Sequence, residues 1–167
     1  AGRGRYARSW YSPPRSNLYL SLLLRPPLAA PQVAQVTMLV SLAAAEAIRA
    51  VTGLSPELKW PNDLLLGGKK VAGILAEMET AESGAVRWVV VGIGINVNER
   101  FADADLEPWR RDATSLRLAC GHDVDRDALR EVLLVETATR YAALKQGARF
   151  HDEWSRRLNL IGRGVSL

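Results

Sequence analysis

The sequence contains a single cysteine and no long hydrophobic run, and both absences narrow the class of protein. Cys120 is the only cysteine in 167 residues, so an intrachain disulfide is excluded and a reducing, cytoplasmic compartment is expected. The apolar runs fall short of the roughly 18 residues that a membrane-spanning helix needs, so no membrane association is expected. Cys120, His122 and Asp123 are expected to form a loop before a helix, because the chain has only one other histidine and no second cysteine for a metal site. The sequence therefore does not predict which residues, if any, bind a metal ion directly.

Acidic residues are absent from the first 45 positions, whereas basic residues are not. This segment carries five arginines, and the first carboxylate is Glu46, so the segment contributes +5 to a formal net charge of +4. Concentrated positive charge attracts anionic ligands. A net charge of +4 over 167 residues is nevertheless too mild to indicate a nucleic-acid-binding protein by itself.

The densest basic segment is Gly2-Arg3-Gly4-Arg5-Tyr6-Ala7-Arg8-Ser9-Trp10. Glycines let the backbone approach a ligand closely, and arginines offer forked donors that match phosphate or carboxylate oxygens. An Arg/Gly run at a chain end is also typical of a disordered nucleic-acid-binding tail. A substrate-binding loop is the favoured interpretation, because the run is short, carries Trp10 and leads directly into a strand-like segment.

Lysine is scarce. The chain has four lysines beside eighteen arginines, and three of the four are Lys59, Lys69 and Lys70. Lysine is a compact charge that can move between phosphate oxygens, and it is not interchangeable with arginine. These lysines flank Trp60-Pro61-Asn62-Asp63 and precede Val71-Ala72-Gly73-Ile74. The window therefore predicts chemistry on an anionic group, and the plain alternative is a solvated hairpin turn at 66–69.

Periodicity and turn residues predict how helices and strands alternate along the chain. Pro31 suits the first turn of one long helix and Gly53 its end, and Asp125 or Asp127 would cap a second. The predicted helices span 31–53, 125–147 and 150–157, and the predicted strands 17–25, 57–60, 69–79, 88–97 and 164–167. The acidic segment 99–112 is expected to be a surface loop.

This order favours an α+β domain, with one mixed or antiparallel sheet and helices packed on one side. The βαβαβ alternation of doubly wound folds is absent, and so is a GxxxxGK[ST] phosphate loop. The apolar strand at 88–97 is expected to be central and buried on both faces. Its glycines, Gly92 and Gly94, indicate either close approach of a ligand or relief of crowding beneath a helix.

Together these motifs resemble the central domain of biotin protein ligases, whose fold is related to class II aminoacyl-tRNA synthetases. The resemblance is carried by Gly-Arg-Gly-Arg at 2–5 with Trp10, Lys-Trp-Pro-Asn-Asp at 59–63, Lys-Val-Ala-Gly-Ile-Leu at 70–75 and Gly-Ile-Gly-Ile-Asn at 92–96. Their order and spacing match over essentially the whole chain. The resemblance implies a catalytic domain at 1–162 that lacks its N-terminal strands, and the start of a C-terminal SH3-like domain at 163–167.

The implied enzyme activates biotin with ATP and Mg²⁺ as biotinyl-5′-adenylate. It then transfers biotin to one lysine of a biotin carboxyl-carrier domain, such as that of acetyl-CoA carboxylase. The biotin carboxylate and the ATP phosphates repel each other, so cations must offset their charge and align them. A homodimer is a further expectation, and DNA binding by this chain is not expected because no winged helix is present. The alternatives are a lipoate or octanoate ligase or transferase of the related fold, which lacks the Lys-Trp-Pro-Asn-Asp block, and a non-catalytic ligand- or nucleic-acid-binding module.

The resemblance also implies roles for single residues. Lys70 is expected to bridge carboxylate and phosphate, Lys59 to support the phosphates, and Asn62 to hold the phosphate–magnesium unit. Asp63 is expected either to accept a proton from the carrier lysine or to pair structurally with Lys59 or Arg5. The other binding residues, with Trp10 on adenine and Asn96 on the ribose or phosphate side, are Gly2, Arg3, Gly4, Arg5, Arg8, Trp10, Gly73, Gly92, Gly94 and Asn96. Trp60 is expected in the core. Ala7 replaces a glycine that is usual in the family.

Overall fold

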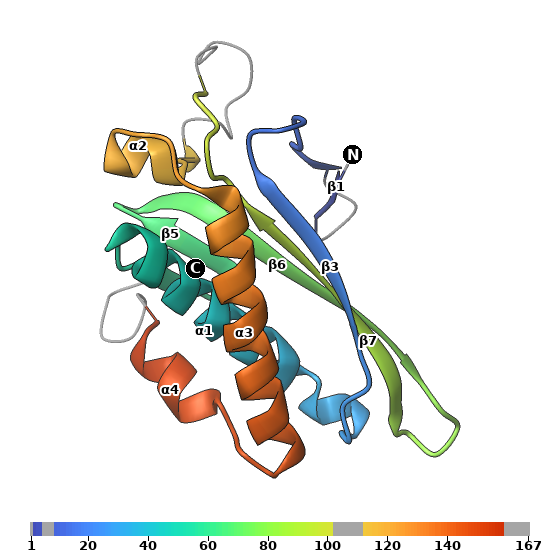
Figure 1. Cartoon of the computed structure of the whole chain (residues 1–167). Helices are drawn as coiled ribbons and strands as arrows, with labels where there is room; N and C mark the ends of the chain where they lie inside the picture. The colour runs from blue at the N-terminus through green and yellow to red at the C-terminus, as the bar shows by residue number, and fades with distance from the viewer. Residues whose placement is uncertain (1, 5–8, 102–111, 159–167) are drawn as a thin grey trace, which may run out of the picture.

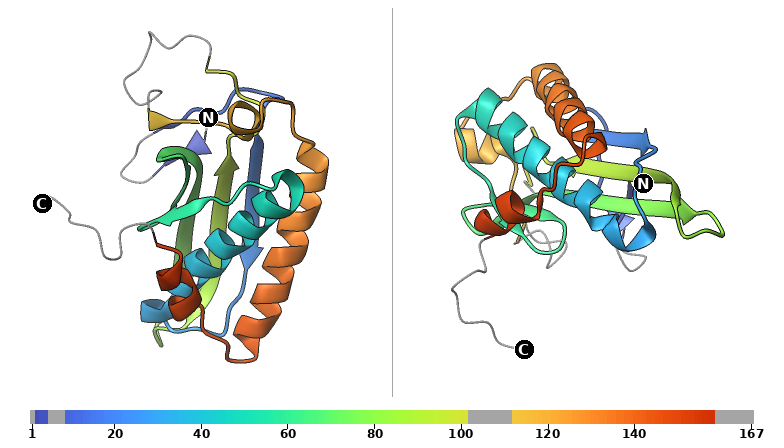
Figure 2. Two further views of the ribbon diagram at one scale, coloured as in Figure 1. Left: turned by 90° about the vertical axis from the view of Figure 1, so that its left-hand side faces the viewer. Right: turned by 90° about the horizontal axis from the view of Figure 1, so that it is seen from below.

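The computed structural model describes residues 2–4, 9–101 and 112–158, and these residues form a sheet with helices on one face. Five strands pair antiparallel in the order β3-β7-β6-β5-β4. They are β3 (Leu18–Leu24), β4 (Glu57–Lys59), β5 (Asp63–Leu66), β6 (Lys69–Thr80) and β7 (Val86–Ile95). Helices α1 (Ala34–Thr52) and α3 (Arg126–Lys145) lie on the same side of the strands (Figures 1 and 2). We call the opposite side the open face. The predicted α+β class is confirmed.

The central strand β7 shows why one face is open. Val89, Val91, Ile93 and Ile95 alternate along β7 and are buried on the helix side. The residues between them, which include two glycines, are only half-buried on the open face. The prediction that this strand is buried on both faces is therefore wrong. Because the helices lie on the other side, its glycines do not relieve crowding beneath a helix.

Helix α1 forms the centre of the core. Its fully buried face carries small alanines among valines and leucines, so the helix packs closely against β4, β5, β6 and α3. The helix ends at Gly53, which has φ 73° as predicted for a C-cap. Pro31 lies in a separate 3₁₀ turn, η2 (Ala30–Gln32), so α1 begins later than predicted. By length and composition alone, the 23-residue segment Ala30–Thr52 could cross a membrane, and 56% of its most apolar window is buried inside the fold.

The second half of the chain follows the predicted capping signals. Asp125 caps α3 by accepting hydrogen bonds from two backbone N–H groups. Helix α4 (His151–Arg156) lies within the helix predicted at 150–157, and its Trp154 is buried. A short helix that the sequence did not predict, α2 (Leu116–Cys120), is capped by Ser115. Cys120 therefore ends a helix, and its predicted place in a loop is wrong.

The region around the lysine-rich window differs from the sequence prediction in two ways. Strand β5 was not predicted, and it joins β6 through Gly67 and Gly68, which have φ 57° and 77°. The side chain of Trp60 lies on the surface, with 62% of the residue exposed, so its predicted place in the core is wrong. Most of the acidic segment 99–112, and the residues 159–167 that contain the expected last strand and the start of the next domain, lie outside the described residues.

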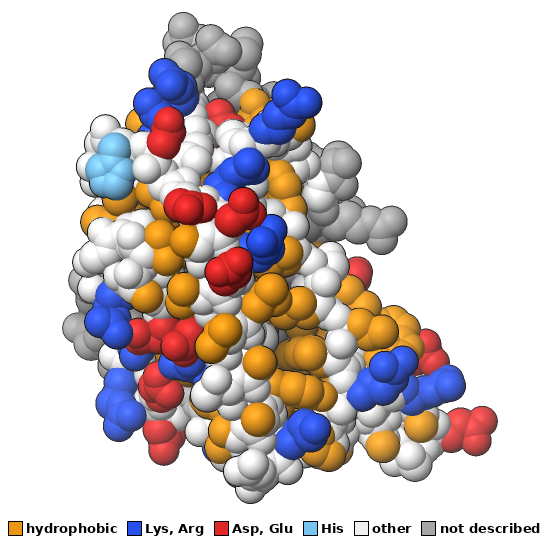
Figure 3. Space-filling model, in the orientation of Figure 1, with side chains coloured by type: hydrophobic (Ala, Val, Ile, Leu, Met, Phe, Trp, Pro, Cys, Tyr) orange, Lys and Arg blue, Asp and Glu red, His pale blue; other side chains and the backbone are white. Residues whose placement is uncertain are grey.

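Ion pairs join the helices on the face that Figure 3 shows, where acidic and basic side chains lie side by side. Arg157, the C-cap residue after α4, places its Nη1 2.7 Å from Glu46 Oε1 on α1, and Arg49 Nη2 lies 2.7 Å from Glu46 Oε2. Burial acts to raise the pKa of Glu46, but hydrogen bonds and charge from Arg49 and Arg157 outweigh it and hold the pKa below its ordinary value.

Candidate active site

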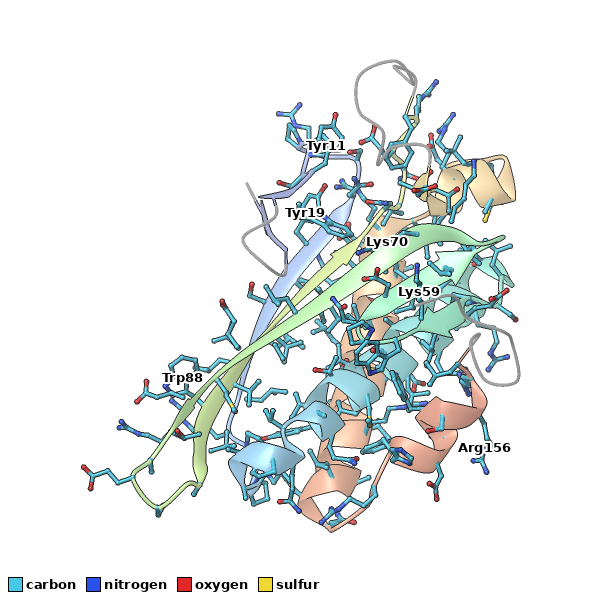
Figure 4. All side chains as sticks on the ribbon, turned by 180° about the vertical axis from the view of Figure 1, so that it is seen from behind. Tyr11, Tyr19, Lys59, Lys70, Trp88 and Arg156 are labelled. Atoms are coloured by element: carbon cyan, nitrogen blue, oxygen red, sulfur yellow. The ribbon has the colours of Figure 1, made fainter. Side chains whose placement is uncertain are left out.

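One row of residues crosses all five strands on the open face. Lys59 pairs with Asp63, Asp63 with Gly73, Gly73 with Gly94, and Gly94 with Tyr19. Directly paired residues of an antiparallel sheet project to the same face. This cross-strand row therefore has a cation and a carboxylate at one end, two glycines in the middle and a phenol at the other end. Figure 4 shows Lys59 and Lys70 near the charged end of the row, and Tyr11 and Tyr19 near the other end.

A single hollow covers the cross-strand row. Its volume is about 1540 Å³, which exceeds the space that one small ligand needs and suits two substrates side by side. It brings together every predicted site residue whose side chain is described: Gly2, Gly4, Trp10, Lys59, Asn62, Asp63, Lys70, Gly73, Gly92, Gly94 and Asn96. Arg5, Arg8, Ala7 and the side chain of Arg3 lie outside the described part of the chain.

A β-bulge brings Lys70 into the hollow. Leu64 pairs with Ala72, but its neighbour Leu65 pairs with Lys70, so Val71 is an extra residue on β6. In a regular strand without a bulge, Lys70 and Ala72 would share a face, because side chains two residues apart point to the same side. Ala72 is fully buried beneath the sheet, whereas Lys70 lines the hollow beside Gly73. The extra residue thus directs the lysine to the open face, a common function of bulges near active sites.

Lys70 contacts two of the other predicted site residues. Its Nζ lies 2.6 Å from Asp63 Oδ1 and 5.1 Å from the centroid of a Trp10 ring. The contact with Asp63 is one of charge at short range, since no described donor reaches that oxygen with hydrogen-bond geometry. Within the described residues, Asp63 forms its ion pair with Lys70 and not with Lys59, which corrects one predicted pairing. The other predicted partner, Arg5, lies outside the described residues.

The indole of Trp10 rests on the two glycines of the cross-strand row. A Cβ added to Gly94 would lie 2.7 Å from Trp10 Cε2, and one added to Gly73 would lie 2.9 Å from Trp10 Cζ3. Only glycine leaves room for the ring at these positions. The Trp10 Nε1 is buried and has no hydrogen-bond partner among the described residues. The two glycines therefore form a flat floor, and the Trp10 indole that lies on it has an Nε1–H without a hydrogen-bond acceptor among the described residues.

Two asparagines that line the hollow, Asn62 and Asn96, use their side-chain NH₂ groups to bond backbone carbonyls of the fold. Asn62 Nδ2 donates to the Ile74 carbonyl at 2.8 Å, which ties the turn before β5 onto β6. Asn96 is buried, and its Nδ2 donates to the Thr114 carbonyl at 3.0 Å. No described residue donates to Oδ1 of either amide, so each asparagine offers the hollow an acceptor. An acceptor suits a hydroxyl or a metal ion, and does not suit a phosphate oxygen.

The sequence did not single out the β3 side of the hollow. Tyr19 and Ser21 face the glycines Gly94 and Gly92 across the β3–β7 pairing, and both line the hollow. Their alternation along β3 would have revealed them had the register been known. Burial raises the pKa of Tyr19, and the hydrogen bond from Asn17 opposes that effect, so the phenol is neutral at physiological pH. Tyr19 is thus a neutral donor and acceptor opposite the charged end.

The open antiparallel sheet, its helices on one face and the charged hollow on the other define the fold class of class II synthetase-like ligase domains. Comparison with known proteins identifies the family. The profile of the Biotin/lipoate A/B protein ligase family matches residues 1–96. The chain belongs to this family.

Two relatives and one solved structure give the extent of the likeness. A bifunctional ligase/repressor BirA of Bacillus spizizenii is 42% identical over 141 residues, which cover 84% of this chain and 43% of the relative. The biotin–[acetyl-CoA-carboxylase] ligase of Paracoccus denitrificans is 35% identical over 99% of this chain and 70% of its own length. The biotin protein ligase from Aquifex aeolicus, solved with biotin and ATP, has a TM-score of 0.81 and 30% identity, over 96% of this chain and 66% of that one. The chain thus spans about half to two thirds of the length of these proteins.

Proposed function

We propose that this chain is the catalytic part of an enzyme that joins biotin to ATP as biotinyl-5′-adenylate and then transfers biotin to a lysine of a carrier protein. The observation that carries the proposal is the cross-strand row, which sets Lys59, Asp63 and the glycine floor in one hollow with Lys70. The names of the Paracoccus and Aquifex proteins support the same activity.

In the first step, a biotin carboxylate oxygen attacks the α-phosphorus of ATP, and the bond from that phosphorus to the bridging oxygen of pyrophosphate breaks. The carboxylate and the phosphates are both negatively charged, so the step depends on cations that already lie in the hollow. Lys70 would exchange Asp63 for the two reacting oxygens, and Lys59 would hold the departing phosphates. Arg3, Arg5 and Arg8 would add charge from the loop, next to the backbone of Gly2 and Gly4.

In the second step, the carrier lysine attacks the acyl carbon of the adenylate, and AMP leaves. The attacking amine must lose a proton, and Asp63 would accept it. In the described structure Asp63 is held by Lys70 at 2.6 Å, so it becomes available only when Lys70 has turned to the phosphate. The first step therefore prepares the base for the second.

Biotin would lie on the glycine floor formed by Gly73 and Gly94, with Gly92 beside it. Since the Trp10 indole covers this floor, the ring must move when biotin enters. Once displaced, it would be placed to stack on adenine. Asn96, with its free acceptor, would serve a ribose hydroxyl.

The oxygen donors of the hollow fit a magnesium ion that arrives with ATP. Mg²⁺ keeps several waters and needs only one or two protein oxygens. Asn62 Oδ1, which lines the hollow and accepts no hydrogen bond from a described residue, would supply one of them. Bound there, the ion would neutralise phosphate charge. Among the described residues, no group of three or more His, Cys, Asp or Glu side chains forms a metal site of its own.

The carrier would be the biotin carboxyl-carrier domain of acetyl-CoA carboxylase or a related carboxylase. The printed name of the Paracoccus relative supports this choice. A cytoplasmic location would provide ATP and the reduced Cys120 thiol. A homodimer stays a prediction.

Biotin-dependent exchange of radiolabelled pyrophosphate into ATP, measured on the full-length protein, tests this function. We expect exchange with biotin and none with lipoate or octanoate. Lys70→Ala should lower kcat at least 100-fold, and Lys70→Arg should not restore it because the planar guanidinium cannot follow the moving charge. Exchange that is equal with lipoate, or near-normal in Lys70→Ala, would contradict the proposal.

A further inference from the structure

The bulge that delivers Lys70 to the hollow is itself held by other parts of the fold. The Lys70 carbonyl accepts a hydrogen bond from the Thr114 backbone N–H at 2.8 Å. The carbonyl of the extra residue, Val71, accepts one from the Asn96 backbone N–H, also at 2.8 Å. Both bonds come from outside β6, so the bulge does not depend on β6 alone.

The side chain of Asn96 links these two supports. Its Nδ2 donates to the Thr114 carbonyl at 3.0 Å, and Thr114 uses its own N–H to hold Lys70. Thr114 lies on a short segment without regular structure, next to Ala113, which forms an isolated bridge with Lys70. Asn96 is 6% exposed, so water has little access to these bonds. This buried amide adds to the other bonds that hold the segment, from the Leu116 N–H to the Asn96 carbonyl at 3.0 Å and from Ser115 Oγ to the Glu99 carbonyl at 2.6 Å.

We infer that Asn96 is a positioning residue, which holds the bulge through Thr114 and thereby fixes where the Lys70 ammonium meets the substrate. This inference rests on the proposed function and deepens it. A small error in the position of a catalytic group costs a large factor in rate. Asn96 would therefore act on the rate through Lys70, in addition to any contact that its free Oδ1 makes.

Asn98 provides a matched control on the same segment. Its amide donates to the Val124 carbonyl at 2.9 Å and accepts from the Val124 N–H at 2.9 Å. It fastens the start of α3 as Asn96 fastens the Thr114 segment, but it has no bond to Lys70 or Thr114. Loss of either amide should lower stability by a similar amount, and only loss of Asn96 should disturb the lysine.

The experiment compares Asn96→Ala and Asn98→Ala in the full-length protein by biotin-dependent pyrophosphate exchange. We expect Asn96→Ala to lower kcat about 10- to 100-fold, with KM for biotin within threefold. The KM for ATP is free to rise, because the proposed contact of Asn96 Oδ1 with the ribose is lost as well. Asn98→Ala should stay within about threefold of the wild type in kcat and in both KM values. Activity in the wild type tests the proposed function, and the contrast between the variants tests this inference. An unchanged kcat in Asn96→Ala, even with a higher KM for ATP, or equal losses in the two variants, would overturn the inference.

A double-mutant cycle shows whether Asn96 acts through Lys70. The ligand is a hydrolysis-resistant biotinyl phosphate analogue, which has the acyl phosphate that Lys70 would contact but no ribose for Asn96. Its affinity is measured by calorimetry in the wild type, Asn96→Ala, Lys70→Ala and the double variant. We expect Asn96→Ala to weaken binding in the wild type and to change it less than twofold when Lys70 is already alanine. Additive losses would show that Asn96 acts independently of Lys70. If Asn96→Ala does not fold, Asn96→Ser takes its place, with the same two outcomes.

Discussion

Gly94 is the position where one added methyl group should change the hollow most. An alanine Cβ there would lie 2.7 Å from Trp10 Cε2 and 2.8 Å from Trp10 Nε1. Carbon atoms in contact normally lie about 3.5–4.0 Å apart, so the ring would have to move by about 1 Å. The strand itself accepts alanine, because the backbone of Gly94 does not have the positive φ that requires glycine.

The effect on folding should be small. Alanine loses less backbone entropy than glycine, which contributes about 0.5–1 kcal/mol in a strand and offsets lost contacts with the indole. We expect the free energy of unfolding of Gly94→Ala to lie within about 1 kcal/mol of the wild type. Biotin affinity, in contrast, should fall at least tenfold, or about 1.4 kcal/mol, because the methyl group occupies the proposed floor of the site.

The indole N–H resonance of Trp10 reports directly on the ring. The chain has five tryptophans, and the Trp10 signal is assigned by its loss in Trp10→Phe. We expect Gly94→Ala to shift this signal strongly. Gly92→Ala should leave it in place, because a Cβ at Gly92 meets only the Leu75 carbonyl, at an ordinary 3.7 Å. An unshifted signal and wild-type biotin affinity in folded Gly94→Ala would show that the indole does not rest on this glycine.

Two further predictions concern carboxylates. Asp63→Asn should retain pyrophosphate exchange but slow transfer of biotin to the carrier at least tenfold, measured by single-turnover transfer from preformed adenylate; equal loss in both steps would contradict a role as base. Because the pKa of Glu46 is lowered in the folded state, Glu46 stabilises the fold above its unfolded pKa, and this contribution is lost as pH falls through the folded pKa. In urea unfolding, Glu46→Gln should therefore be less stable than the wild type at pH 7 and lose less stability between pH 5 and pH 3. The control, exposed Glu131→Gln, should follow the wild type. Parallel plots of unfolding free energy against pH for Glu46→Gln and the wild type would refute the coupling.

Much of the fold could be predicted from local signals in the sequence. Helices α1 and α3 end or begin at residues whose chemistry is local, a glycine at Gly53 and an aspartate cap at Asp125. Strand β3 is bounded by prolines, and β7 was predicted from a continuous apolar run. The site residues in the Lys-Trp-Pro-Asn-Asp and Gly-Ile-Gly-Ile-Asn motifs were predicted from the resemblance to biotin protein ligases that these short blocks carry.

The parts that could not be predicted depend on pairing between distant segments. A strand of four residues, β5, has too few positions for a period to show, and its existence depends on the neighbours β4 and β6. Trp60 looked like a core residue because tryptophan is large and apolar, but it lies at the turn between two short strands, where the sheet has no second layer to cover it. The bulge at Val71 is invisible in the sequence, because its apolar side chain suits a regular strand equally well.

The register explains why the predicted residues act together and also why the two proposed steps have an order. In the described structure Lys70 is already neutralised by Asp63, and its other side faces the Trp10 ring. A phosphate can recruit Lys70 only by replacing the Asp63 carboxylate, and the same exchange leaves Asp63 without its cation. The freed carboxylate is then available to the attacking amine, so Asp63 can act as the base once the adenylate has formed. In the proposed reaction, the exchange of partners by one lysine side chain would thus favour transfer to the carrier lysine after activation.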